Sequence, residues 1–292
     1  MISFFSNIFG YVLNWIYFLV QNYGLAIILF SILVKILMLP LSIKQHKTLK
    51  KNEKVQNEMK ILQVKHKGNP EKLNQELMEL YKREKINPLS GCFSVIIQFI
   101  LILSMFYLVR SPLTYMKKID STKIEQQITE VKEKNGEQNI SKTYPEMAVI
   151  EYLKDNDIKE NDMYINMDFL GLDLSKVPQE NFRDIKVFII PVLYVISSVV
   201  SIKFTTAMTK KKEDNKELRV DKENNENKEM DQEKMAAQMN KNMSLMMPIL
   251  SVSISLVAPL GLALYWLVNN ITMIIERLVL NKIFSKEEEE NA

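Results

Sequence analysis

The sequence contains few residues of the kinds that build disulfides, metal sites and catalytic sites. Its 292 residues include one cysteine, Cys92, and two histidines, His46 and His66. One cysteine excludes an intramolecular disulfide and a cysteine-cluster metal site, and two histidines argue against a histidine-based metal site or catalytic triad. The seven glycines form neither a G-x-G-x-x-G nor a G-x-x-x-x-G-K-S/T phosphate loop. We therefore expect no catalytic residue, no metal and no cofactor.

Charged residues are balanced in number and very unevenly distributed. A net charge of +3 is too small to indicate nucleic-acid binding. Residues 1–34 contain no Asp, Glu, Lys, Arg or His, whereas residues 205–244 contain nine Lys or Arg and nine Asp or Glu. Such blocks indicate a chain that alternates between lipid and water, and not one mixed globule.

Five apolar segments are long enough, or nearly so, to cross a bilayer as helices. A hydrocarbon core of about 30 Å needs roughly 20 apolar residues, and a shorter span is accommodated by local thinning. A buried helix of a soluble protein would normally keep a charged face, and these segments have almost none. The sequence predicts an all-α membrane protein with spans at 23–43, 89–110, 186–204, 242–258 and 261–281. A single kinked span in place of the last two is the main alternative.

The distribution of basic residues predicts the orientation of these spans. The segment 44–88 has twelve Lys or Arg and six acids, whereas 111–185 has ten and fifteen. Because Lys and Arg are retained in the cytoplasm, we expect 44–88 and 205–241 to be cytoplasmic and 111–185 to be extracellular. The N-terminus is then outside and the tail 282–292 inside, which requires five crossings.

Residues 1–22 are predicted to form an amphipathic helix in the outer membrane interface. A secretory signal would begin with basic residues, and this segment has none. Small and polar residues, Ser6 and Gly10 among them, fall opposite an apolar face that we expect to contact lipid. The alternatives are an uncleaved signal or a sixth span.

The basic segment 44–88 is predicted to form a helical hairpin. Its break is at Gly68-Asn69-Pro70. Each arm carries one narrow apolar stripe at helical spacing, formed by Val55, Met59 and Leu62 in the first arm and by Leu73, Leu77 and Leu80 in the second. Two such stripes are enough for an antiparallel pair.

Four ordered stretches resemble the YidC/Oxa/Alb family of membrane protein insertases. They are Y-G-L-A-I through K to L-P-L and K-Q at 23–45, N-P-L-S-G-C with a later Q at 87–98, F-L-G-L-D-L at 169–174, and P-L-G-L-A-L-Y-W with N-N at 259–270. The lack of a large folded domain before the first span is similar to the Gram-positive form. Two features depart from the family pattern: the family usually has Arg at the position of Lys35, and the loop 111–185 is long.

The resemblance implies a five-helix insertase core with an interfacial N-terminal helix and a cytoplasmic hairpin. Such a protein of the cell membrane would capture hydrophilic segments of nascent membrane proteins in a hydrated groove that is closed outside. It would release their hydrophobic spans laterally into the lipid bilayer as insertase and chaperone, alone or with the Sec translocon. The hairpin would receive the ribosome or the signal-recognition-particle pathway. The alternative is a transporter or channel for ions or small solutes, against which the lack of an internal repeat argues.

Lys35 is the leading candidate for the groove. It precedes Lys44 by nine residues, about 13 Å along a helix. A charge at this depth costs about 2.5 kcal/mol or more, so it should face water or a partner. We expect water, because the nearest acid, Glu276, sits beside Arg277 near the inner interface. A buried acidic partner is the structural alternative.

Further groove candidates follow from their positions on the second and fifth spans. Ser94 and Gln98 share one face of the second span, and Trp266, Asn269 and Thr272 recur three apart on the fifth. An amide or hydroxyl in lipid requires hydrogen-bond partners. For Asn269, Asn270 and Thr272, helix–helix hydrogen bonding is an equally good interpretation.

Overall fold

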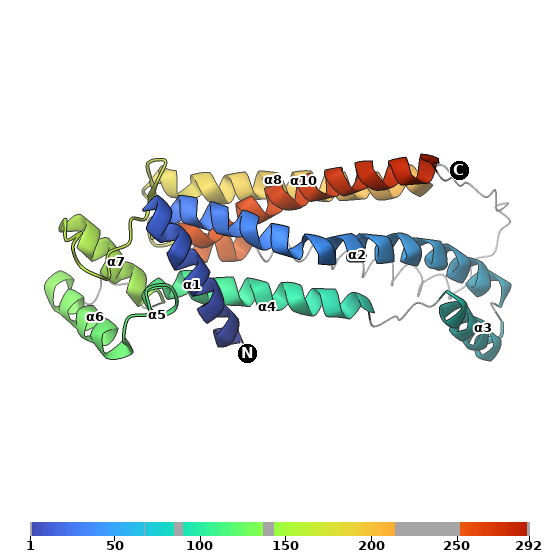
Figure 1. Ribbon diagram of the computed structural model, residues 1–292, viewed down its shortest axis with the longest axis horizontal. Coiled ribbons are helices and arrows are strands. Elements are labelled where there is room, and N and C mark those ends of the chain that lie inside the picture. Colours follow the sequence, from blue (N-terminus) through green and yellow to red (C-terminus); the bar gives the residue numbers. More distant parts are fainter. Residues whose placement is uncertain (1, 67, 85–89, 137–142, 214–251, 291–292) are drawn as a thin grey trace.

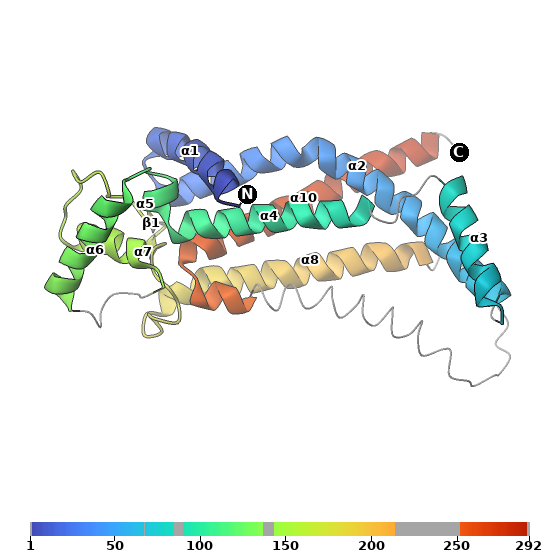
Figure 2. The same ribbon diagram turned by 90° about the horizontal axis from the view of Figure 1, so that it is seen from below.

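The protein is an elongated helical bundle. The computed structural model describes residues 2–66, 68–84, 90–136, 143–213 and 252–290. Four long helices run side by side along its length: α2 (Tyr23–Lys65), α4 (Ser90–Arg110), α8 (Ile189–Glu213) and α10 (Leu260–Glu290) (Figure 1). The described residues of 111–188, here the loop domain, lie at one end of the bundle. Helix α3 (Pro70–Arg83) and the C-terminus lie at the other, the hairpin end (Figure 2).

The predicted all-α membrane fold is confirmed. Four described helical segments are long and apolar enough to cross a bilayer, namely Ile2–Val20, Tyr23–Gln45, Ile185–Lys203 and Leu260–Phe284. Within α4, the residues Phe99–Arg110 form a further apolar helical stretch, shorter than these four when only the described residues are searched. Residues 242–251 of the predicted fourth span lie outside the described residues, and 252–257 are helical up to the turn at Pro259.

Helix α2 is longer than the sequence patterns indicated. The predicted span 23–43 and the first arm of the hairpin form one helix of 43 residues, about 64 Å long. Asn22 caps its start, since the Asn22 side chain accepts a hydrogen bond from the Leu25 amide. Pro40 lies inside the helix without ending it. At the far end α3 folds back on α2, and Val55 and Leu80 are buried between the two helices.

Helix α1 (Ile2–Val20) packs on the bundle through two small residues, Ser6 and Gly10, and through Leu13, Ile16 and Tyr17. Ser6 and Gly10 are buried, and the Ser6 hydroxyl donates to the Ser104 carbonyl of α4 at 3.1 Å. A β-carbon at Gly10 would lie 1.8 Å from the Tyr115 carbonyl oxygen. Several other large apolar side chains of α1 are exposed, namely Phe4, Ile8, Tyr11, Trp15, Phe18 and Leu19. The small residues form a seam that allows close helix approach, as is common within membranes.

The loop domain is a folded unit. Two of its helices are α6 (Ser121–Asn135) and α7 (Pro145–Asp155). Its other elements are α5 (Pro112–Tyr115), the 3-10 helix η2 (Ile185–Phe188) and an antiparallel ribbon of β1 (Asp168–Phe169) with β2 (Leu172–Asp173). The sequence patterns gave no sign of this ribbon.

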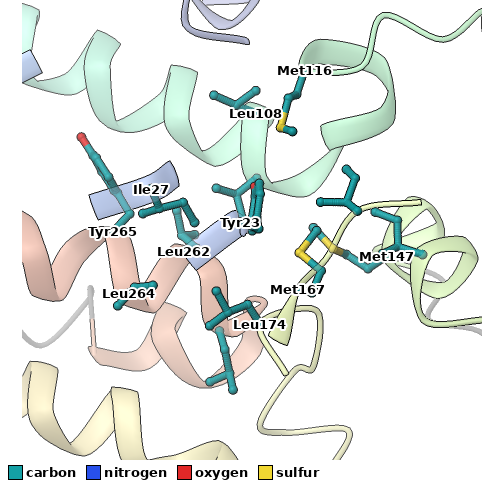
Figure 3. Packing of buried hydrophobic residues seen from close by; sticks show 14 of the residues in the cluster. Tyr23, Ile27, Leu108, Met116, Met147, Met167, Leu174, Leu262, Leu264 and Tyr265 are labelled. Atoms are coloured by element: carbon teal, nitrogen blue, oxygen red, sulfur yellow. The ribbon is translucent and has the colours of Figure 1, made fainter. Parts of the chain in front are cut away.

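The hydrophobic core lies where the loop domain meets the bundle. Buried side chains from α2, α4, α10 and the loop domain converge there, among them Tyr23, Ile27, Leu108, Met116, Met147, Met167, Leu174, Leu262 and Leu264 (Figure 3). Backbone hydrogen bonds reinforce this packing. The Tyr23 amide donates to the Asn166 carbonyl at 3.0 Å, and the Gly261 amide donates to the Leu174 carbonyl at 3.0 Å. The first turns of α2 and α10 are therefore fixed to the loop domain.

Candidate functional site

Lys35 of α2 forms an ion pair with Glu276 of α10. The Lys35 Nζ atom lies 2.5 Å from the Glu276 Oε2 atom, and the two side chains are 24% and 10% exposed. Both residues lie within segments that are apolar enough to span a bilayer. The pair therefore places two opposite charges between two membrane helices.

The expectation that Lys35 has no acidic partner is wrong. Helices α2 and α10 both begin at the loop-domain end, where a β-carbon on Gly261 would contact Tyr23 at 3.3 Å. Lys35 comes twelve residues after Tyr23, and Glu276 comes sixteen after Leu260. The offset of four residues is about 6 Å along the axis, which a lysine side chain can bridge. Counting both helices from the same end is the signal that would have found this partner.

A pocket of about 240 Å³ surrounds the ion pair. Apart from Lys35, Glu276 and Thr272, it is lined by apolar side chains, namely Ile32, Ile36, Leu39, Ile275, Val279 and Leu280. The Thr272 hydroxyl donates to carbonyl oxygens of its own helix, those of Val268 at 2.9 Å and Asn269 at 3.0 Å. Glu276 Oε1 is buried and has no hydrogen-bond partner within the described part of the chain. The carboxylate of the pair is thus only half satisfied.

The other predicted groove residues are dispersed. Trp266 is 8% exposed and packs on Tyr194 of α8, with ring centroids 5.9 Å apart, so it belongs to the core. Asn269 is half-buried and does not line the pocket around Lys35. The Asn270 amide donates to Ser198 Oγ at 2.8 Å and joins α10 to α8, as the helix–helix interpretation predicts.

Two candidates cannot be placed. Ser94 and Gln98 are on α4, but their side chains lie outside the described residues. Of the predicted set, the structure therefore brings together Lys35 and Thr272 and adds Glu276. Among the described residues, no group of three or more His, Cys, Asp or Glu could hold a metal ion.

A second charged pocket, of about 300 Å³, lies in the loop domain and has a different character. Lys154 Nζ contacts Asp168 Oδ1 at 2.6 Å and Asp173 Oδ2 at 2.7 Å, which joins α7 to both strands of the ribbon. Burial alone would raise the pKa of Asp173, but hydrogen bonds from Lys154 and Ser175 outweigh burial and lower that pKa. These charges are mutually satisfied, so they hold the loop domain together.

Comparison with known proteins supports a membrane function. The family model described as 60Kd inner membrane protein matches residues 15–288. Three relatives, each named Membrane protein insertase YidC, come from Francisella tularensis subsp. novicida (strain U112), subsp. tularensis (strain WY96-3418) and subsp. holarctica (strain OSU18). Each is 44% identical over 107 residues, which is 37% of this chain and 19% of the relative. The matched stretch thus spans about a fifth of these relatives' length.

Proposed function

Because this chain belongs to the YidC/Oxa/Alb family of membrane protein insertases, we propose that it inserts nascent membrane proteins into the lipid bilayer. The observation that carries this proposal is the family match, which extends over residues 15–288 and so includes every described membrane helix except the first residues of α1. The relatives that are named as insertases support the same activity.

In the proposed mechanism, the pocket around Lys35 is part of a hydrated groove that receives hydrophilic segments of a substrate. A charged side chain at the bilayer centre costs about 2.5–3.5 kcal/mol by insertion scales, so polar groups need a wet, charged path. Lys35 supplies the positive charge that attracts acidic residues. Apolar residues beside it, such as Ile36 at 61% exposed, favour lateral release of the substrate's hydrophobic span into lipid.

Two features support a groove that is closed at one end and open at the other. The core and the loop domain fill the bundle end that contains the first turns of α2 and α10. Towards the hairpin end the packing is looser, because no described side chain of the apolar part of α2 is buried beyond Ser31. With the loop domain outside and the basic hairpin inside, the groove opens to the cytoplasm.

The partners follow from this orientation. The hairpin formed by α3 and the end of α2 would receive the ribosome, the signal-recognition-particle pathway or the nascent chain. The protein would also act as a chaperone for membrane segments and would work alone or beside the Sec translocon.

The orientation can be tested with external protease on intact protoplasts, which should cut within 121–162 and spare 44–87. Cleavage of the hairpin from outside would overturn the orientation.

Insertion into liposomes that contain the purified protein tests the function directly. A substrate with one apolar span should insert in the presence of the protein and form a photo-crosslink from a reactive residue at position 36. The same reactive residue at Leu193, an exposed position of α8 outside the pocket, is the control. Solute flux through these liposomes without insertion would instead support the transporter or channel alternative.

A further inference from the structure

The ion pair between Lys35 and Glu276 bears on which substrates the pocket prefers. Lys35 Nζ already contacts Glu276 Oε2 at 2.5 Å, so the cation needed for capture is neutralised by the chain itself. A substrate carboxylate must take the place of this oxygen before it can contact Lys35. Building on the proposed function, we propose that Glu276 is an internal competitor of acidic substrate side chains at Lys35 and thereby sets the charge preference of the insertase.

The environment of Glu276 allows its carboxylate to be exchanged for another carboxylate at Lys35. Its second oxygen, Oε1, is buried without a hydrogen-bond partner among the described residues, and Thr272 directs its hydroxyl to its own backbone. A buried ion pair is firmly held only when its remaining hydrogen-bonding capacity is also satisfied. The Glu276 carboxylate is therefore replaceable by another carboxylate that reaches Lys35.

The pocket has the size and lining that such an exchange needs. Its volume of about 240 Å³ has room for a side chain, and its walls are apolar. Charges interact more strongly in apolar surroundings than in water, so a single charge at position 276 affects every ion that enters. With Glu276 present, the pocket is neutral overall and accepts an acid at Lys35 or a base at Glu276. Without the carboxylate it would be cationic and selective for acids.

The test compares three substrates that differ at one residue of the translocated segment, which is Asp, Asn or Lys. Capture is measured as the yield of the photo-crosslink from position 36 in liposomes that contain the full chain. Glu276→Gln should raise the Asp-to-Asn capture ratio on the order of five-fold, equivalent to about 1 kcal/mol. It should also lower the Lys-to-Asn ratio. Glu125→Gln removes an exposed carboxylate of the loop domain and should leave both ratios unchanged.

Glu276→Asp provides the second variant if Glu276→Gln does not accumulate in the membrane. Aspartate keeps the charge but is one methylene shorter, which weakens the contact with Lys35. Its Asp-to-Asn ratio should lie between those of the wild type and Glu276→Gln. A purely structural role for Glu276 would change protein level or total capture and leave these ratios unchanged.

The outcomes separate this inference from the proposed function. If Lys35→Gln lowers the Asp-to-Asn ratio while Glu276→Gln and Glu276→Asp leave it unchanged or lower it, capture by Lys35 stands and competition by Glu276 is overturned. If Lys35→Gln itself leaves the ratio unchanged, electrostatic capture fails and the competition fails with it. A higher ratio in the Glu276 variants, lost again in the double variant Lys35→Gln/Glu276→Gln, supports competition at Lys35.

Discussion

The loop-domain half and the hairpin half of the membrane bundle are held together by different forces. Along α2, the buried side chains of the apolar part end at Ser31, and those of α10 are concentrated between Leu260 and Trp266. Beyond these points α10 still buries Leu280 and Phe284, and the ion pair of Lys35 with Glu276 joins α2 to α10 beside apolar side chains that are mostly exposed. The loop-domain half, the packed half, is stabilised by its buried side chains. The hairpin half, the open half, combines weak packing with a pair of charges, which suits a region that exchanges partners.

The largest expected effect tests the stability of the packed half. Leu108→Ala removes a fully buried side chain and should cost about 2–5 kcal/mol of the free energy of unfolding. Leu39→Ala, at a pocket residue that is 39% exposed, should cost well under half as much. The measurement is the midpoint of thermal unfolding in detergent. Equal losses for the two variants would mean that the halves are packed alike.

The second prediction tests whether the ion pair of Lys35 with Glu276 stabilises the open half of the bundle. Lys35→Gln removes the ion-pair partner of the buried Glu276 carboxylate and should destabilise the protein by about 1–3 kcal/mol. If Lys35 had no acidic partner, as the sequence analysis expects, removing its charge would leave the stability of the protein unchanged or increase it. The double variant Lys35→Gln/Glu276→Gln should recover most of the loss in the same unfolding assay. A double variant as unstable as the single one would argue against a direct pair.

A smaller effect is expected at the hydrogen bonds between α8 and α10. Asn270→Ala removes the amide that donates to Ser197 and Ser198, and such bonds within membranes average about 0.6 kcal/mol. Asn269→Ala is the matched control, because no hydrogen bond from the Asn269 side chain occurs among the described residues. The difference between the two midpoints measures the helix–helix contribution. Identical midpoints for the two variants would mean that the hydrogen bonds of Asn270 do not stabilise the protein.

The smallest effect concerns pH and the loop domain. Burial raises the pKa of Glu146 above its ordinary value of 4.5, although Thr114 and Leu113 donate hydrogen bonds to it and oppose this. Because the folded state binds the proton more tightly, the contribution of Glu146 to stability is fully present below about pH 4.5 and is lost as pH rises through the raised pKa. Glu146→Gln should remove this dependence. Protease resistance of the loop domain between pH 4.5 and 7 measures it, and an equal slope in the variant would contradict the assignment.

The sequence predicts what depends on local pattern. Hydrophobic length predicts that α2, α8 and α10 are membrane helices, and the family motifs single out Lys35. A local start signal is also present in α7, which begins at Pro145, since proline is favoured in the first turn of a helix. Each of these signals lies within about 20 residues of the element that it predicts.

The missed features depend on contacts between distant segments. The pair of Lys35 with Glu276 joins residues far apart in the chain and requires the relative register of two helices. Burial of Gly10 depends on Tyr115, and the short ribbon β1–β2 is stabilised by Lys154 of α7. Periodicity identifies an apolar face, but it does not say whether that face meets lipid or protein.

The continuity of α2 has a mechanical consequence. The helix is fixed at its first turn, near Tyr23, and continues unbroken to Lys65, so it is a lever about 64 Å long whose pivot lies in the packed half. Lys35 lies a little under a third of the way from the pivot to the tip. If the helix tilts as a rigid rod, a sideways displacement of about 10 Å at the tip moves Lys35 by about 3 Å. This displacement of Lys35 exceeds the 2.5 Å distance between its Nζ atom and Glu276 Oε2. A force applied to the hairpin therefore moves Lys35 less than it moves the tip, but it acts on the ion pair as a larger force.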